Sequence, residues 1–242
     1  MSIKVKICGL TNLEDARLAL ACGADELGFV LAPSPRRVEP EAVRAIVEAL
    51  KGEGRFVGFR AIGVFVNEEP DAMRGILSYA SLDAAQVHGD ETPETCSAFD
   101  FPWYRALRIA SVAEALELAG AGWRCPRILV DASGSAYGGT GSSIGTWAAL
   151  AARAVARDSG REYFVAGGVR PRNAASFVYS LSPDGIDVSS GVEEAPGRKS
   201  PEKLEALFRA IRAAEGAGAE GMRAEGGGDA GQQAEEPRRA AG

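Results

Sequence analysis

The stretch at residues 4–11, Lys4-Val5-Lys6-Ile7-Cys8-Gly9-Leu10-Thr11, holds the first unit of a pattern that recurs along the chain. Apolar residues alternate along its first half, which predicts a short β-strand. A Cys-Gly turn follows, and Thr11 with Glu14 forms the residue pair expected where a helix begins. The stretch therefore predicts a strand, a loop that carries the Cys8 thiol, and a helix.

The same succession of an apolar strand and an amphipathic helix occurs eight times. The expected strands lie near residues 3–8, 27–31, 61–66, 84–88, 103–109, 127–131, 163–166 and 185–190. Such alternation predicts a parallel sheet covered by helices, and eight units within about 212 residues fit a compact, single-domain α/β fold, the (β/α)₈ TIM barrel. A doubly wound open sheet is the alternative, but its G-x-G-x-x-G signature after the first strand is missing.

The composition changes after the last expected helix, which Ser200 should cap and Pro201 should begin. Beyond about residue 215 the chain consists mostly of Gly, Ala, Glu, Gln and Arg, with almost no apolar residue to bury. We therefore expect a barrel domain at residues 1–214 and a disordered, low-complexity tail at residues 215–242.

Charge and composition limit the classes of function. The 242 residues carry a formal net charge of −6 and no basic run, so no nucleic-acid partner is expected. Neither a signal peptide nor an apolar stretch of roughly 20 residues is present, which predicts a cytoplasmic protein without a membrane segment.

The four cysteines are scattered and His88 is the only histidine, so neither a disulfide framework nor a metal site is expected. A monomer is favoured, and the sequence leaves a homodimer open.

Two ionisable side chains end strands of the expected barrel, where the chemistry of this fold is carried out. Asp131 ends the sixth strand, and burial there would raise the pKa of its carboxyl and make it a proton donor at neutral pH. An Asx turn is the alternative. Cys8 ends the first strand and is either a buried structural thiol or a base whose pKa a nearby cation must lower.

Glycines and serines follow the last two strands, a place where barrels of this kind frequently bind phosphate. Gly167 and Gly168 follow the seventh strand, and Ser189, Ser190 and Gly191 end the eighth. Backbone N–H groups and hydroxyls in these loops can donate to an anion, although tight turns would use the same residues. The two loops together predict a phosphate site.

Three further features leave their roles open. Arg36 follows the second strand and can bind a carboxylate through two nitrogens, as can the adjacent Arg37. A single histidine such as His88 is more often structural than catalytic. The loop that contains residues 138–141, Gly-Gly-Thr-Gly, is either a lid or a flexible connection.

The order of these motifs resembles that of the phosphoribosylanthranilate isomerase family of tryptophan biosynthesis. The similar stretches, which span nearly all of residues 3–212, are Lys6-Ile7-Cys8-Gly9-Leu10-Thr11, Gly23-Ala24-Asp25, Ser34-Pro35-Arg36, Gly63-Val64-Phe65-Val66-Asn67, Gln86-Val87-His88-Gly89-Asp90, Gly138-Gly139-Thr140-Gly141, Ala166-Gly167-Gly168, Asp187-Val188-Ser189-Ser190-Gly191-Val192-Glu193 and Pro196-Gly197. The segment at residues 51–60 is longer than the family's usual connection, residues 141–145 are richer in small polar residues, and the tail has no counterpart.

The resemblance implies an Amadori rearrangement of N-(5-phosphoribosyl)anthranilate, a small phosphosugar substrate, to 1-(2-carboxyphenylamino)-1-deoxyribulose 5-phosphate without metal or organic cofactor. In the family an aspartate protonates the furanose oxygen and a cysteine removes the C2 proton. By position these residues are Asp131 and Cys8. Arg36 matches the contact to the anthranilate carboxylate, and the two glycine-serine loops match the phosphate site.

Two alternatives differ in class. A related phosphosugar isomerase of histidine biosynthesis runs the same rearrangement with an aspartate in place of the cysteine, so Cys8 favours the tryptophan-pathway enzyme. A non-catalytic, phosphate-binding barrel would need no acid-base pair, so the presence of both Cys8 and Asp131 favours an enzyme.

Overall fold

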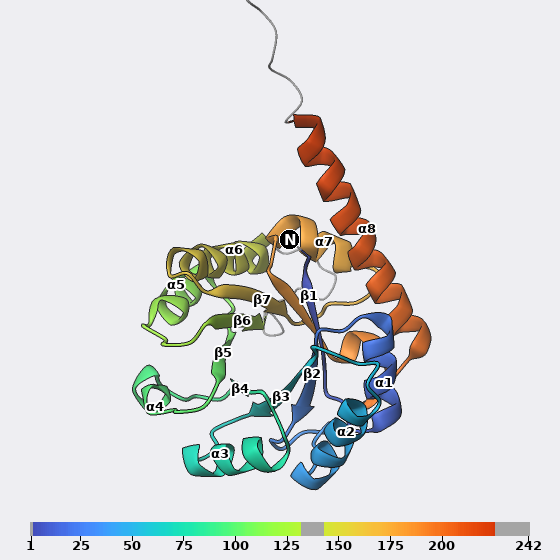
Figure 1. Cartoon of the computed structure of the whole chain (residues 1–242). Helices are drawn as coiled ribbons and strands as arrows, with labels where there is room; N and C mark the ends of the chain where they lie inside the picture. Colours follow the sequence, from blue (N-terminus) through green and yellow to red (C-terminus); the bar gives the residue numbers. More distant parts are fainter. Residues whose placement is uncertain (1, 132–142, 226–242) are drawn as a thin grey trace, which may run out of the picture.

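The fold was analysed in a computed structural model that describes residues 2–131 and 143–225. Eight parallel strands, β1 to β8, pair in chain order and close into a barrel, and helices surround it (Figure 1). Strand β1 pairs with β2 on one side and with β8 on the other, which completes the closure. The predicted TIM barrel is confirmed.

The elements follow the predicted alternation. The barrel strands are β1 (Lys4–Cys8), β2 (Glu26–Val30), β3 (Arg60–Phe65), β4 (Ala84–Val87), β5 (Trp103–Arg108), β6 (Arg127–Asp131), β7 (Glu162–Ala166) and β8 (Gly185–Val188). The helices are α1 (Leu13–Cys22), α2 (Pro40–Gly52), α3 (Pro70–Tyr79), α4 (Pro93–Ser97), α5 (Val112–Gly120), α6 (Ser143–Asp158), α7 (Ala174–Leu181) and α8 (Pro201–Glu225).

Strand β1 shows how the alternating side chains are sorted. Val5 and Ile7 belong to the large apolar core that also contains buried helix residues. Lys6 lies on the opposite face because successive side chains of a strand alternate, and it is 0% exposed inside the barrel. The apolar residues of β1 therefore face the helices, while the interior of the barrel receives a charged side chain.

The interior of the barrel is only partly apolar. One small buried cluster, separate from the large core, contains Ile62, Ala84, Tyr104, Ala106, Leu129, Phe164 and Ala166. Buried polar residues on the same strands, such as Lys6, Glu26, Gln86 and Arg127, occupy much of the remaining interior. Buried charges need partners, and the partners found here form two networks, one at each end of the barrel.

The start of α1 differs from the prediction by one residue. Asn12, rather than Thr11, is the N-cap, and its side-chain oxygen accepts a hydrogen bond from the Asp15 N–H at 2.8 Å. Thr11 instead donates its hydroxyl to the carbonyl of Gly197 at 2.7 Å. Both side chains can cap a helix, and the distant carbonyl that binds Thr11 is invisible in the local sequence.

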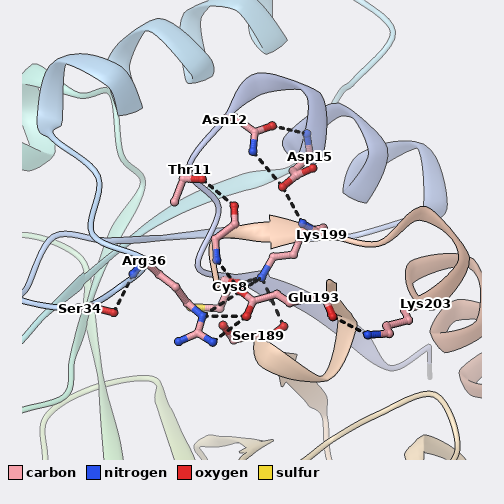
Figure 2. Close-up of polar contacts among 11 residues, drawn as sticks. Cys8, Thr11, Asn12, Asp15, Ser34, Arg36, Ser189, Glu193, Lys199 and Lys203 are labelled. Carbon is pink, nitrogen blue, oxygen red and sulfur yellow. Dashed lines mark hydrogen bonds and ion pairs between the residues drawn. The ribbon is translucent and has the colours of Figure 1, made fainter. Parts of the chain in front are cut away.

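A short hairpin interrupts the connection from β8 to α8 and was not predicted. A 3₁₀ turn, η2 (Ser190–Val192), leads into β9 (Glu193–Ala195), which pairs antiparallel with β10 (Arg198–Lys199). Ser200 then accepts a hydrogen bond from the Lys203 N–H at 3.3 Å, which confirms the predicted cap of α8. The hairpin lies beside the carboxyl end of β1 (Figure 2).

Helix α8 continues eleven residues past the predicted boundary at 214/215. Ala214 is buried, and the carboxylate of Glu215 accepts hydrogen bonds from the Ile3 N–H at 2.6 Å and the Ser2 hydroxyl at 3.2 Å. The last part of the helix projects away from the barrel (Figure 1), so residues 215–225, expected within the tail, are helical. The division into a barrel and a disordered tail stays a prediction, and residues 226–242 lie outside the described part. Within the described ranges, no helix combines the length and apolarity needed to cross a membrane.

Candidate active site

A cavity of about 400 Å³ lies at the carboxyl ends of the strands. The residues predicted for the site all line it, namely Cys8, Arg36, Asp131, Gly167, Gly168, Ser189, Ser190 and Gly191. The wall also contains Gln86, His88 and Asp187 and a set of apolar side chains that includes Val30, Ala32 and Val64. Residues that are far apart in the sequence are thus brought together as the barrel closes.

Cys8 presents its thiol at the end of β1, where 8% of the residue is exposed. Burial raises the pKa of this thiol above its ordinary value, and the positive charges of Lys6 and Lys199 oppose that rise. The negative charge of Asp187 adds to it. The two lysines therefore favour the thiolate form of Cys8, whereas burial and Asp187 favour the protonated thiol.

Asp131 ends β6 on the opposite side of the cavity mouth. Its Oδ2 lies 3.5 Å from Nε2 of His88, and Nδ1 of His88 lies 3.2 Å from the side-chain nitrogen of Gln86. His88, whose role the sequence left open, is thus a neighbour of the predicted acid. The lid predicted at residues 138–141 lies outside the described residues.

A polar network beneath the cavity connects four strands, β1, β4, β5 and β8. The Lys6 ammonium donates to Oε1 of Gln86 at 2.8 Å and to Oδ2 of Asp187 at 3.0 Å, and the Tyr104 hydroxyl donates to the same oxygen of Gln86 at 2.9 Å. Burial raises the pKa of Asp187 although Lys6 opposes the rise, and Oδ1 of this carboxylate has no hydrogen-bond partner among the described residues. Sequence reasoning noted Gln86 in the fourth strand without giving it a role, and it missed Tyr104. Polar residues at inward-facing positions of apolar strands were the signal.

Arg36 lines the cavity, whereas Arg37 is exposed and pairs with Glu39 outside it. Nε and Nη2 of Arg36 contact the carboxylate of Glu193 at 2.8 and 2.6 Å. Nη1 makes no hydrogen bond to any described residue, so the free edge of the guanidinium can still bind a carboxylate. The structure therefore separates the two arginines that the sequence could not.

The hairpin supplies a second unpredicted group. Lys199 donates to Oε1 of Glu193 at 2.9 Å and to the carbonyl of Cys8 at 2.6 Å, as Figure 2 shows. Burial lowers the pKa of Lys199, although the hydrogen bond and charge of Glu193 oppose that change. Glu193 lies within a motif quoted for the family, but its contact with Arg36 spans 157 positions in sequence and had no local signal.

The predicted phosphate loops pack closely on each other. Gly167 and Gly168 adopt positive φ angles of 87° and 72°, which a residue with a side chain rarely adopts. A Cβ atom at Gly191 would overlap the carbonyl of Val169, so the loop after β8 passes directly against the loop after β7. Only glycine permits this approach, and it brings the backbone of both loops to one wall of the cavity.

Comparisons with known proteins agree with this geometry. The family model described as N-(5'-phosphoribosyl)anthranilate (PRA) isomerase matches residues 5–210. The N-(5'-phosphoribosyl)anthranilate isomerase of Trichlorobacter lovleyi is 41% identical over 209 residues, which are 86% of this chain and 97% of that protein. The crystal structure of phosphoribosyl anthranilate isomerase from Thermus thermophilus is 41% identical, with a TM-score of 0.73 over 87% of this chain and 99% of that one.

A further solved structure contains a ligand. It is a phosphoribosyl anthranilate isomerase in complex with reduced 1-(o-carboxyphenylamino)-1-deoxyribulose 5-phosphate, 32% identical to this chain, with a TM-score of 0.71 and coverage of 87% and 99% of the two chains. The family model covers most of the chain, and the relatives match along nearly their whole length. The chain belongs to the N-(5'-phosphoribosyl)anthranilate isomerase family.

Proposed function

We propose that this chain catalyses the Amadori rearrangement of N-(5-phosphoribosyl)anthranilate in tryptophan biosynthesis. The observation that carries the proposal is the single cavity that holds the Cys8 thiol, the Asp131 carboxylate and the Arg36 guanidinium. Its volume of about 400 Å³ lies within the range of small-molecule sites, about 300–1,000 Å³. The ligand bound by the related isomerase is a reduced form of the product of this reaction.

The cavity offers a partner for each part of the substrate. The free edge of Arg36 suits the carboxylate of the anthranilate ring, because a planar guanidinium binds a carboxylate through two parallel hydrogen bonds. Val30, Ala32 and Val64 provide an apolar wall for the ring itself. The loops after β7 and β8 suit the 5-phosphate, since Gly167, Gly168 and Gly191 bring their backbones to the cavity wall beside the Ser189 and Ser190 residues.

The reaction requires one acid and one base. Asp131 donates a proton to the furanose oxygen, the ring C1–O bond breaks, and the lone pair of the anilino nitrogen forms an iminium with C1. Cys8, as thiolate, then removes the C2 proton, and the electron pair left at C2 gives the enolamine, which tautomerises to the ketone. General acid-base catalysis of this kind contributes about 10²- to 10⁴-fold for each group.

The surroundings of each group fit its role. Lys6 and Lys199 place positive charge near Cys8, which favours the thiolate that the base step needs. His88 lies beside Asp131, where it can orient the carboxyl toward the ring oxygen. The polar interior therefore supports both groups from below the cavity.

The proposal includes the cytoplasmic location and the monomeric state that were expected from the sequence. An isomerase that handles a phosphorylated intermediate of amino-acid synthesis works in the cytoplasm, where that intermediate is made. A single chain contains the complete set of proposed groups, which is consistent with a monomer. Analytical ultracentrifugation of the purified protein measures the oligomeric state directly.

The decisive experiment is a fluorescence assay that follows the consumption of freshly prepared N-(5-phosphoribosyl)anthranilate. The histidine-pathway substrate is assayed in parallel. We expect turnover of the first substrate, and we expect Cys8→Ala to lower kcat by about 10²- to 10⁴-fold while folding and phosphate binding persist. Cys22→Ala, on helix α1 and outside the cavity, is the matched control and should keep full activity. Turnover of the histidine-pathway substrate alone, or near-normal activity of Cys8→Ala, would contradict the proposal.

A further inference from the structure

Hairpin β9–β10 carries an ion pair that is almost completely buried. Nζ of Lys199 lies 2.9 Å from Oε1 of Glu193, and the two side chains are 0% and 4% exposed. Removing two charges from water costs free energy that a buried pair often does not recover. The other contacts of the pair show what it achieves in this position.

Lys199 links two strand ends that line the cavity. Its ammonium donates to the carbonyl of Cys8 at 2.6 Å and contacts the carbonyl of Ser189 at 3.3 Å (Figure 2). The first carbonyl belongs to the proposed base and the second to the proposed phosphate loop. One ammonium group therefore fixes the separation between the residue that removes the C2 proton and the loop that binds the far end of the substrate.

Glu193 holds the third substrate-binding element. Its carboxylate binds Nε and Nη2 of Arg36, and its Oε1 also accepts a hydrogen bond from the Gly197 N–H at 3.3 Å. The stem of Arg36 lies across Gly9, where a Cβ atom would be 2.6 Å from Cδ of the arginine. The guanidinium is thus fixed at two points, and its Nη1 edge stays free.

We propose that Glu193 and Lys199 are positioning residues of the isomerase reaction. Glu193 orients Arg36 toward the aryl carboxylate of the substrate, and Lys199 sets the spacing between the base and the phosphate loop. The inference rests on the proposed function above and adds to it two residues that touch no reacting atom. A misplacement of about 1 Å at a site of this kind can cost roughly 10²-fold in rate.

The charge of Lys199 gives the inference a signature that packing alone lacks. The charged groups that face Cys8 are Lys6 on β1, Asp187 on β8, Lys199 on β10 and Arg36 after β2. The positive charge of Lys199, like that of Lys6, lowers the pKa of the Cys8 thiol. Without its ammonium the pKa of Cys8 rises, and the pH at which the base becomes active rises with it.

The test compares two pairs of residues on the same hairpin. Lys199→Met and Glu193→Gln remove the buried pair, one residue at a time and with little change in volume. Glu194→Gln and Arg198→Met are the matched controls, because these two side chains form an exposed pair at 3.2 Å on the outside of the hairpin. For each protein we would measure kcat, KM, the pH profile of kcat/KM, and the dissociation constants of inorganic phosphate and of reduced 1-(o-carboxyphenylamino)-1-deoxyribulose 5-phosphate.

We expect different defects from the two variants of the buried pair. Glu193→Gln should raise KM and the dissociation constant of the reduced ligand about tenfold with little change in kcat, because binding must then immobilise a freer arginine. Lys199→Met should lower kcat about 100-fold and shift the rising limb of the pH profile to higher pH. The exposed controls should stay within about twofold of the wild type, since exposed ion pairs contribute little.

The outcomes are distinguishable. If the wild type does not turn over N-(5-phosphoribosyl)anthranilate, the proposed function fails. If the wild type is active but both Glu193→Gln and Lys199→Met keep its kcat, KM and pH profile, the inference is overturned. It is also overturned if Lys199→Met loses rate without a shift of the pH profile, or if neither variant folds, because the pair then has a structural role only.

Discussion

Charged side chains gather at both ends of the barrel, and the two ends differ in how far contacts offset the effect of burial on their pKa values. The amino-terminal cluster consists of Lys4, Glu26, Arg127 and Glu162, which are the first residues of β1, β2, β6 and β7. The carboxyl-terminal end holds Cys8, Asp187 and the hairpin pair Glu193 and Lys199. The two ends therefore allow a comparison between ion pairs that stabilise the fold and ionisable groups that line the candidate active site.

At the amino-terminal end, the contacts outweigh burial. Arg127 donates to Glu26 at 2.7 Å and to Glu162 at 2.8 Å, and its guanidinium lies 3.7 Å from the ring centroid of Phe164. Burial alone would lower the pKa of Arg127, but the hydrogen bond and charge of Glu26 raise it above the ordinary value. Burial likewise would raise the pKa of Glu162, but hydrogen bonds from Lys4 and Arg127 lower it. The contacts therefore favour the charged forms of Arg127 and Glu162.

At the carboxyl-terminal end, contacts raise the pKa of Lys6 and lower that of Glu193, but burial outweighs the contacts of three other groups. It raises the pKa values of Cys8 and Asp187 and lowers that of Lys199, in each case against an oppositely charged neighbour. Groups whose pKa values are shifted by burial cluster at sites where enzymes carry out proton transfer. The difference indicates that ion pairs at the amino-terminal end stabilise the barrel, while the groups at the carboxyl-terminal end are suited to proton transfer.

The largest expected effect comes from removing the acid. Asp131→Asn keeps the size of the side chain but cannot donate a carboxyl proton, so kcat should fall about 10²- to 10⁴-fold. Thermal unfolding should change little, and phosphate should still bind. Steady-state kinetics with a thermal melt measures both. An active Asp131→Asn enzyme would break the assignment of reactivity to this end of the barrel.

The next effect is the reverse, a loss of stability with activity retained. Arg127→Met removes the closer partner of the buried Glu26 carboxylate and leaves only Arg60, at 3.5 Å, beside it, which should destabilise the fold by up to about 3–5 kcal/mol. The kcat of the protein that remains folded should be unchanged. Lys4→Met is the control, because its partially exposed pair with Glu162 should contribute at most about 1 kcal/mol. Denaturant titration and kinetics below the melting temperature check both variants. A large kcat defect in Arg127→Met would contradict the difference proposed between the two ends of the barrel.

The smallest effect is a graded one in pH. The proposed role of Cys8 requires its thiolate, and burial raises the pKa of the thiol. On this proposal, kcat/KM should rise about tenfold per pH unit until that pKa is reached. Cys8→Asp replaces a thiol of ordinary pKa about 8.5 by a carboxyl of about 3.9, so the rising limb should move several units toward acid. Rates measured between about pH 5 and pH 10 would show the shift. A limb that stays in place would assign the titration to another group.

The alternation of apolar strands and amphipathic helices was sufficient to predict the barrel, because each strand pairs with the strands of the adjacent units and each unit buries its apolar faces in the same way. It did not identify the hairpin, since strands of three and two residues carry no periodic pattern. The Thr11 cap failed for a similar reason. Its true partner, the carbonyl of Gly197, is 186 positions away.

The candidate site followed from the rule that barrel chemistry lies at strand ends, which placed Cys8, Asp131 and the glycine loops on one rim before any coordinates. The groups that tune them were not predictable in this way. Lys199 contacts Cys8 across 191 positions and follows no long strand. Gln86 was visible only as a polar residue within a buried strand, and its bond to Lys6 depends on closure of the barrel.

The contact between Glu215 and the backbone of Ile3 makes the barrel nearly circular as a chain. The first strand and the last helix are neighbours, so a short linker between residues near 216 and Ser2 would close a ring. New ends could then be opened in the connection at residues 53–58, where Val57 is 88% exposed, without interrupting any of the eight strand pairings. The order of the eight units around the barrel, rather than the point at which the chain begins, is what the architecture requires.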